Sequence, residues 1–369
     1  MKKHAVNFLV FEMKTCYNHH KYLCRSAEAF FMNQKRNLFF RKSIGLLLSF
    51  ALVFSAVAFC GCSNNAEISQ PATTASDIDL VQDATEYSSS VVPLSRNGVE
   101  LHLERLTVKN TSPERNILLA HGVTYSSHEF DVDYKDYSLV RFLAREGYAV
   151  WWLDIAGFGR SGEVKDGFIS DSDYAAEDIN AAVEKIVSES GQNKIDILGW
   201  SWGTVTASRS VIKNPGHIGK LVLYAPILSG IGEYEVTEDF HHNTWEHAAD
   251  DFQYASDGGF DYSITEPEMI EMFCSSCWHY DGEQSPNGGR RDICVDKSEK
   301  LIDLSKITVP TLVICGSNDP YLNYDLVNAS LDSLPEGSQL EIIDGGAHVI
   351  MYEKPYYHEF QSELIGFLK

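Results

Sequence analysis

The stretch Ile195-Asp196-Ile197-Leu198-Gly199-Trp200-Ser201-Trp202-Gly203 decides the fold of this chain. It begins as a short apolar strand, passes through a Gly-x-Ser-x-Gly turn and continues into a helix-compatible segment at residues 204–213. Gly199 and Gly203 allow the backbone to turn sharply and keep bulk away from the turn. A serine at such a strand–turn–helix junction presents its hydroxyl above a sheet. The stretch therefore predicts that Ser201 is a nucleophile at the end of a central strand.

Short apolar runs alternate with helix-like runs on both sides of this turn. The first two runs, at residues 91–94 and 99–106, are joined across Asn97-Gly98, which is a strong hairpin signal. This alternation is typical of the α/β class, in which helices cover both faces of a mostly parallel sheet. The further predicted strands are residues 117–120, 149–153, 195–198, 221–224, 311–315 and 340–343, and the predicted helices are residues 137–146, 174–189 and 204–213.

The alternation stops between about residues 227 and 300, where no clear strand appears. We expect an inserted cap there that is mainly helical or irregular. Its aromatic residues either line an apolar substrate pocket or form the cap's own core, and both interpretations remain open. These residues are Tyr234, Phe240, Trp245, Phe252, Tyr254, Phe260, Trp278 and Tyr280.

The cap segment also contains acids and histidines that could bind an ammonium group or a metal ion. The acids suit recognition of an ammonium group, but a solvated acidic surface is the interpretation that we favour. The histidines lack the His-Glu-x-x-His spacing of a zinc site, so we expect no metal and no cofactor. The residues concerned are Glu233, Glu235, Asp250 and Asp251 for the acids, and His241, His242 and His247 with Glu246 for the possible metal site.

A serine hydroxyl becomes nucleophilic only when a base takes its proton, and a buried carboxylate must orient that base. The predicted strand at residues 311–315 leads into Gly316-Ser317-Asn318-Asp319, and the strand at residues 340–343 leads into a loop that ends at His348. Both residues therefore follow the ends of later strands, as the acid and the base require. We predict a catalytic triad of Ser201, Asp319 and His348.

Acyl transfer also needs two donors for the oxyanion that forms during attack. The N–H of Trp202 opens the helix after the nucleophile and is one candidate. The second candidate is the N–H of Val123 in the loop after the strand at residues 117–120. His121 in the same loop is another possible base, but we interpret it as structural because His348 fits the triad order better.

These motifs together give residues 91–369 a clear resemblance to the α/β-hydrolase superfamily. The resemblance rests on His121-Gly122, on residues 154–162, on the turn at Ser201, on residues 316–319 and on His348 ahead of Glu353-Lys354-Pro355. It implies an eight-stranded core with a cap inserted after the sixth strand. The Trp-Ser-Trp turn is similar to that of proline iminopeptidases, whereas Asp154-Ile155-Ala156-Gly157 departs from their Asp-Gln-Arg-Gly.

The first 61 residues have the features of an export signal. A basic region around residues 35–42 precedes an uncharged apolar run at residues 44–59 that ends in small residues. Gly61 before Cys62 resembles a bacterial lipoprotein signal, which predicts lipidation of Cys62 and an extracytoplasmic, membrane-anchored protein; an ordinary secretory signal is the alternative. Met32 is a candidate start. Residues 62–90 are polar and predict a flexible tether.

The formal net charge of the whole chain is −22, and it becomes more negative without the basic signal segment. Such an excess of acids argues against nucleic acid as a partner, because phosphate binding needs Lys and Arg. It also argues against docking on anionic lipid through a basic patch, so membrane attachment should come from the lipid anchor alone.

Four cysteines lie in the predicted domain, at positions 274, 277, 294 and 315. Export to an oxidising compartment allows disulfides to persist. We therefore predict one disulfide from Cys294 to either Cys274 or Cys277. A zinc or redox role for Cys274-Ser-Ser-Cys277 is the weaker alternative, because no second paired cluster accompanies it.

The predicted function is hydrolysis of carboxylic esters on small molecules through an acyl-enzyme intermediate. Serine at the turn, and not aspartate, is the feature that favours acyl transfer. Two alternatives remain: an aminopeptidase or amidase of the proline iminopeptidase type, and a non-catalytic ligand-binding lipoprotein. The complete set of triad residues argues against the last.

Overall fold

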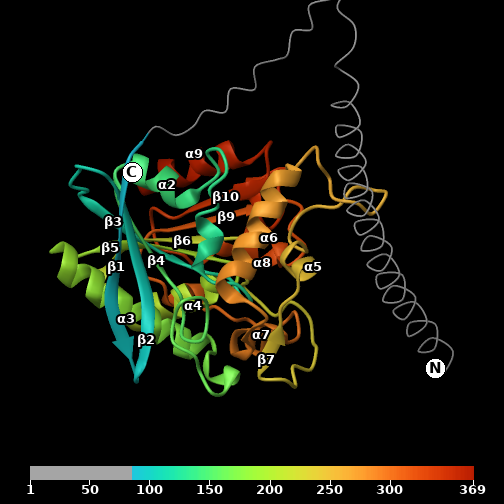
Figure 1. Ribbon diagram of the computed structural model, residues 1–369, viewed down its shortest axis with the longest axis horizontal. Helices are drawn as coiled ribbons and strands as arrows, with labels where there is room; N and C mark the ends of the chain where they lie inside the picture. The colour runs from blue at the N-terminus through green and yellow to red at the C-terminus, as the bar shows by residue number, and fades with distance from the viewer. Residues whose placement is uncertain (1–84) are drawn as a thin grey trace, which may run out of the picture. The chain divides into compact units, whose positions relative to one another are not determined.

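The computed structural model describes residues 85–369, which are built around an eight-stranded sheet with the order β1-β2-β4-β3-β5-β6-β9-β10 (Figure 1). The β1 and β2 strands are antiparallel to their neighbours, and the other six strands run parallel. All the predicted strands are present, so the α/β class is confirmed. Their bounds are β1 (Tyr87–Arg96), β2 (Val99–Val108), β3 (Arg115–Ala120), β4 (Tyr148–Leu153), β5 (Ile195–Trp200), β6 (Ile218–Tyr224), β9 (Thr311–Gly316) and β10 (Gln339–Ile343).

The hairpin of β1 and β2 turns where the sequence predicts it. Asn97 and Gly98 have φ values of 53° and 82°, so both adopt the left-handed conformation that a tight two-residue turn needs. However, β1 begins at Tyr87, whereas the tether was predicted to extend to residue 90. The serines at positions 88–90 pair with residues 105–107 through backbone groups, and backbone pairing does not require apolar side chains.

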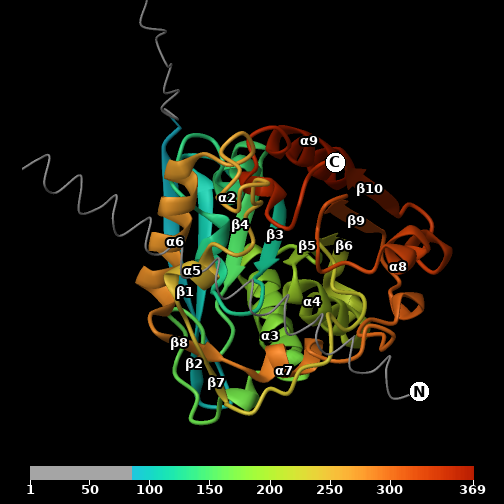
Figure 2. The ribbon, with the colours of Figure 1, turned by 90° about the vertical axis from the view of Figure 1, so that its right-hand side faces the viewer.

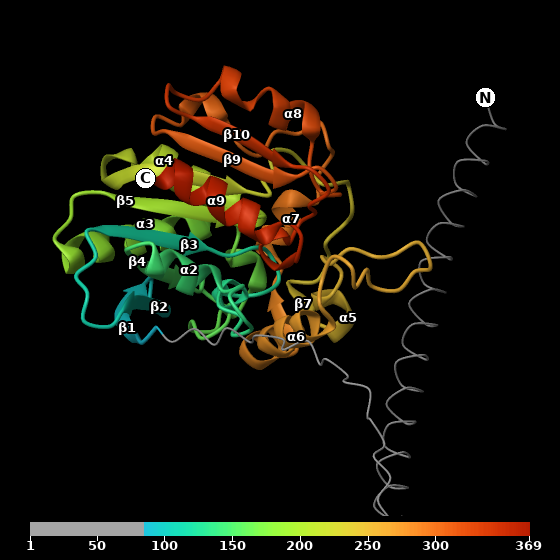
Figure 3. The same ribbon diagram turned by 90° about the horizontal axis from the view of Figure 1, so that it is seen from above.

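Helices cover both faces of the sheet. On one face lie α2 (Leu139–Arg145) and the C-terminal α9 (Tyr357–Leu368), and on the other lie α3 (Ser172–Ser190) and α4 (Trp202–Lys213) (Figure 3). Neighbouring residues of β3 pack in different apolar clusters. Leu119 lies in the cluster with α2 and α9, and Leu118 lies in the cluster with α3 and α4. This division follows from the alternation of side chains along a strand.

The segment between β6 and β9 adds no strand to the eight-stranded sheet. It contains α5 (Trp245–Ala248), α6 (Pro267–Asp281) and α7 (Gly288–Ile293), and it pairs β7 (Phe240–His242) with β8 (Gln284–Pro286) antiparallel (Figure 2). These elements fall within the segment for which a cap was predicted. The β7–β8 pair was not predicted, because strands of three residues show no recognisable alternation.

The aromatic side chains of this segment divide between core and surface. Phe252 and Phe273 are buried against each other, with ring centroids 5.3 Å apart, whereas Tyr234, Trp245 and Trp278 are exposed. The buried pair therefore serves the core. Residues Tyr254–Gly259 form a small turn of their own, in which the N–H of Ala255 donates to the carbonyl of Gly259 at 2.7 Å.

The predicted disulfide of Cys294 is wrong. Cys274, Cys277 and Cys294 are all buried free thiols, as is Cys315. Cys274 and Cys277 lie on α6 and pack in the cluster that contains α2 and α9, whereas Cys294 packs in the cluster that contains α3 and α4. A disulfide requires the two side chains to meet, and these thiols pack in two separate apolar clusters.

The predictions for the N-terminal region, including the signal peptide of residues 1–61 and lipidation of Cys62, lie outside the described residues. Within residues 85–369, no helix is both long and apolar enough to span a bilayer.

Candidate active site

Ser201 lies at the sharp turn between β5 and α4. Its φ and ψ are 56° and −124°, a conformation that is rare for a residue with a side chain, and it is 9% exposed. A Cβ on Gly199 would collide with the carbonyl of Gly203, and one on Gly203 would collide with the carbonyl of Ala120. The two glycines therefore permit the turn for the steric reason inferred from the sequence.

Asp319 and His348 come from the loops after β9 and β10. Asp319 Oδ2 lies 2.7 Å from Nδ1 of His348, and both side chains are buried. Burial alone would lower the pKa of His348, but the charge of Asp319 and its hydrogen bond outweigh burial, so the pKa is raised above its ordinary value. The pair can thus orient the imidazole and stabilise its protonated form.

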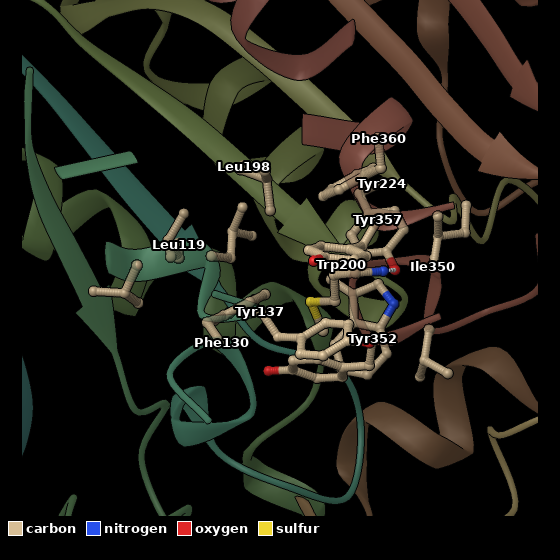
Figure 4. Packing of buried hydrophobic residues seen from close by; sticks show 14 of the residues in the cluster. Leu119, Phe130, Tyr137, Leu198, Trp200, Tyr224, Ile350, Tyr352, Tyr357 and Phe360 are labelled. Carbon is tan, nitrogen blue, oxygen red and sulfur yellow. Dashed lines mark hydrogen bonds between the residues drawn. The ribbon is translucent and has the colours of Figure 1, made fainter. Parts of the chain in front are cut away.

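The loop that carries His348 is tied to the nucleophile turn through Trp200, the residue before Ser201. Trp200 Nε1 donates to the backbone carbonyl of His348 at 3.0 Å, and the two rings pack with centroids 5.5 Å apart. The hydroxyl of Tyr224 donates to the same carbonyl at 3.1 Å. Trp200 and Tyr224 lie side by side in the buried cluster (Figure 4).

Within the described residues the Ser201 hydroxyl forms no hydrogen bond with His348. In unliganded enzymes such bonds are often long and shorten when substrate binds. The structure therefore joins two of the three predicted triad side chains directly, and it connects the third to them through the Trp200 contacts.

The loop after β3 passes close to Ser201. A Cβ on Gly122 would lie 3.4 Å from Cβ of Ser201, which is ordinary contact, and Val123 follows directly. The first N–H groups of α4, which begins at Trp202, have no acceptor in a preceding helical turn. The predicted donors Val123 and Trp202 are therefore on the two backbone segments that flank the serine.

Comparison with known proteins agrees with this arrangement. Residues 111–355 match the family described as serine aminopeptidase, S33. The chain belongs to this family. It is accordingly a hydrolase with the α/β-hydrolase fold, and the superfamily resemblance inferred from the sequence is confirmed.

The sequence of this S33 hydrolase is similar to those of two bacterial proteins. It is 26% identical to the non-heme chloroperoxidase of Burkholderia pyrrocinia, over 69% of this chain and 91% of the relative. It is 22% identical to a non-heme chloroperoxidase of Kitasatospora aureofaciens, over 74% of this chain and 98% of the relative. The chloroperoxidase names belong to those two proteins and state no activity of this chain.

Solved structures show the same fold. The carboxylesterase CesB from Bacillus subtilis has a TM-score of 0.53 and 16% identity, with coverage of 76% of this chain and 92% of that one. A bromoperoxidase from Bacillus anthracis has a TM-score of 0.55 and 20% identity, with coverage of 76% and 99%. At such identities the likeness concerns the fold alone.

His121 of this S33 hydrolase is a structural residue, in agreement with the sequence interpretation. Its Nε2 accepts a hydrogen bond from the N–H of Ile155 at 3.1 Å, so Nδ1 carries the proton and donates to the carbonyl of Gly122 at 2.8 Å. Burial lowers the pKa of His121 and keeps the ring neutral. The side chain therefore braces the loop beside the nucleophile.

Three carboxyl groups, of which Glu129 and Glu353 are buried, hold the loops of the site, and sequence reasoning assigned none of them this role. Glu129 Oε1 accepts from the N–H of Gly122 at 2.7 Å, and Glu353 Oε2 accepts from the N–H of Ala347, next to His348, at 2.9 Å. Asp281, at the end of α6, accepts from the N–H of Ser126 at 3.0 Å. Glu353 was noted only as part of the Glu353-Lys354-Pro355 motif, and no local pattern marks Glu129 or Asp281, because each contacts its partner only after folding.

The histidines of the cap segment do not form a metal site of the kind considered from the sequence. His241 and His247 face each other with ring centroids 4.6 Å apart, and burial lowers the pKa of both, that of His241 to about 3. In the part of the chain that the structure describes, no group of three or more His, Cys, Asp or Glu side chains could hold a metal ion.

Proposed function

We propose that this S33 hydrolase cleaves carboxylic esters through an acyl-enzyme intermediate, with Ser201, His348 and Asp319 as its catalytic triad. The observation that carries the proposal is the 2.7 Å contact between Asp319 and His348, whose loop is bonded to Trp200, the residue before Ser201. A serine at a strand–turn–helix junction, followed along the chain by a carboxylate and an imidazole, supplies the components of nucleophilic acyl transfer.

In the proposed mechanism, His348 takes the proton of Ser201 through Nε2 while Asp319 holds the proton on Nδ1. The serine oxygen attacks the carbonyl carbon of the ester, and the N–H groups of Val123 and Trp202 stabilise the resulting oxyanion. The intermediate collapses as the ester oxygen leaves with the proton from His348. Water, activated by His348, then attacks the acyl-serine and releases the acid.

A fluorophosphonate probe tests the nucleophile, because it reacts covalently with activated serines. We expect labelling of Ser201 in the native chain, and loss of labelling and turnover in Ser201→Ala. Ser208→Ala is a matched control, because Ser208 lies on α4, the helix that follows Ser201, is buried and has an Oγ with no hydrogen-bond partner among the described residues. Labelling that persists in Ser201→Ala would contradict the proposal.

A second candidate function is aminopeptidase activity, which the description of the matching family favours. It is also supported by Asp251 in the cap segment, whose charge is the largest cause of the raised pKa of Tyr321, a ring that packs on His348 with centroids 4.8 Å apart. A carboxylate near the base could bind a substrate ammonium group.

Comparison of p-nitrophenyl esters with aminoacyl p-nitroanilides separates the two candidates. An esterase should turn over the esters and should be affected little by Asp251→Asn. An aminopeptidase should prefer the anilides and lose at least tenfold in kcat/KM on Asp251→Asn, the scale of one lost charge-assisted bond. Glu235→Gln, which neutralises an exposed acid of the same segment, is the control.

A further inference from the structure

Arg290 on α7 is partly buried and has no carboxylate within ion-pair distance in the described chain. Its Nη2 donates to Oγ1 of Thr124, and its Nε donates to Oδ1 of Asn287 at 3.2 Å, so both partners are neutral oxygens. Its neighbour Arg291 differs, because it is exposed and faces Asp171 at 4.0 Å. Buried charges in proteins are normally paired, so an unpaired guanidinium indicates a missing partner.

The position of α7 brings Arg290 to the loop that carries Val123, one of the two proposed oxyanion donors. Gly289 packs on the indole ring of Trp202 so closely that a Cβ would lie 2.5 Å from it. On its other side, Arg290 reaches Thr124, the residue after Val123. Trp202 and Val123 are the two proposed oxyanion donors, so α7 contacts the side chain of one of them and the side chain of the residue that follows the other.

The surroundings of Arg290 leave its charge largely uncompensated. Burial is the main cause of the lowered pKa of Arg290, although the more distant Asp251 acts in the opposite direction. The charge of Arg290 also contributes, after burial, to the lowered pKa values of His241 and His247. Among the described residues, Nε2 of His241 and Nδ1 of His247 are buried without hydrogen-bond partners, so neither nitrogen accepts a hydrogen bond from the guanidinium.

We propose that Arg290 binds a carboxylate carried by the ester substrate, and that the enzyme therefore prefers esters with an acidic group near the scissile carbonyl. This inference rests on the proposed esterase function. A guanidinium offers a planar fork that matches a carboxylate with two parallel hydrogen bonds. The chain has a formal net charge of −22, so its overall field repels anions and selectivity must come from a local cation.

Two matched substrates test the proposal: the mono-p-nitrophenyl ester of glutaric acid, and the same compound with its free acid capped as a methyl ester. We expect the native enzyme to have the higher kcat/KM on the free acid. Arg290→Gln should lose about 30-fold on the free acid, as expected for a lost hydrogen bond to a charged group, and less than about threefold on the capped compound. Arg290→Lys keeps the charge but not the planar fork, so its kcat/KM on the free acid should lie between those of the native enzyme and Arg290→Gln.

Arg291→Gln removes the same charge from the next position of the same helix and should leave both rates unchanged. Equal losses on both substrates in Arg290→Gln would overturn the proposal, because a structural role does not distinguish them. The absence of any preference in the native enzyme would overturn it as well. The melting temperature of each variant shows whether it is folded. If Arg290→Gln has lost its fold, the comparison of the two substrates is made with Arg290→Lys instead.

Two further measurements separate this inference from the proposed function. Fluorophosphonate labelling of native Ser201 reports on the nucleophile, so labelled enzyme without a preference for the acid refutes only the role of Arg290. Calorimetry on Ser201→Ala compares monomethyl glutarate with dimethyl glutarate without any turnover. We expect at least tenfold tighter binding of the monoester, and loss of this difference when Arg290→Gln is added; equal affinities would refute the carboxylate site.

Discussion

Asp319 Oδ2 lies 2.7 Å from Nδ1 of His348, although the two residues come from loops after different strands. Because β9 and β10 are parallel neighbours, their carboxyl ends open on the same edge of the sheet, and the loops that follow them meet there. The N–H of Tyr321 also donates to Asp319, to Oδ1 at 3.0 Å, and this bond fixes the orientation of the carboxylate. The contact is thus a product of sheet topology.

Replacement of Asp319 by Asn should slow turnover by about four orders of magnitude, because the amide no longer holds the proton of His348 on Nδ1. The rate of p-nitrophenolate release measures this effect. Asp344→Asn provides the matched control, since Asp344 is an exposed acid in the neighbouring loop whose carboxylate accepts a hydrogen bond from Ser317 Oγ at 3.1 Å. A rate near the native one in Asp319→Asn would mean that another acid serves His348.

The pH dependence of kcat/KM should follow the neutral form of His348, because only an unprotonated imidazole can accept the serine proton. The pKa of His348 is raised, chiefly by Asp319 acting against burial, so the rate should fall about tenfold per unit below an inflection that lies above pH 6.5. In Asp319→Asn the inflection should move to lower pH. An unchanged inflection would argue that Asp319 does not set this pKa.

The turn conformation of Ser201 carries strain that glycine would relieve. A residue with a Cβ is disfavoured at φ 56° and ψ −124°, whereas glycine tolerates this region. We expect both Ser201→Ala and Ser201→Gly to be inactive, but the glycine variant to have a free energy of unfolding about 1 kcal/mol higher than the alanine variant. Urea denaturation measures the difference; a less stable glycine variant would contradict it.

Asp281 should make folding stability depend on pH. Burial is the main cause that raises its pKa to about 7, with a further contribution from the charge of Asp154. A raised pKa of a carboxyl group in the folded state means that stability is highest below the unfolded value near pH 4 and falls as pH rises towards 7. Asp281→Asn should flatten this slope by up to about 1.4 kcal/mol per pH unit.

Urea denaturation of the native chain and Asp281→Asn at pH 4, 5, 6 and 7 measures the two slopes. The comparison of slopes does not depend on how much the amide itself changes stability. Parallel slopes would show that Asp281 is already ionised throughout this range.

The strands and the hairpin were predictable because their signals are local. The Asn97-Gly98 turn, the apolar runs of the sheet and the glycines on either side of Ser201 each act within a few residues. The β7–β8 pair was not predicted, because a strand of three residues can be recognised only by its hydrogen bonds to the partner strand. The cysteine prediction failed for a related reason: compartment and spacing say nothing about which apolar cluster each thiol joins.

The sequence by itself determined the α/β class, the strand–turn–helix junction at Ser201 and the candidates Asp319 and His348, since each depends on residue type and local spacing. Only the tertiary structure brought Asp319 to His348, tied the His348 loop to Trp200, and placed Arg290 beside Thr124 with no acid of residues 85–369 at ion-pair distance. These relationships join residues distant in the chain, and their positions depend on how strands and helices pack, which no single segment encodes.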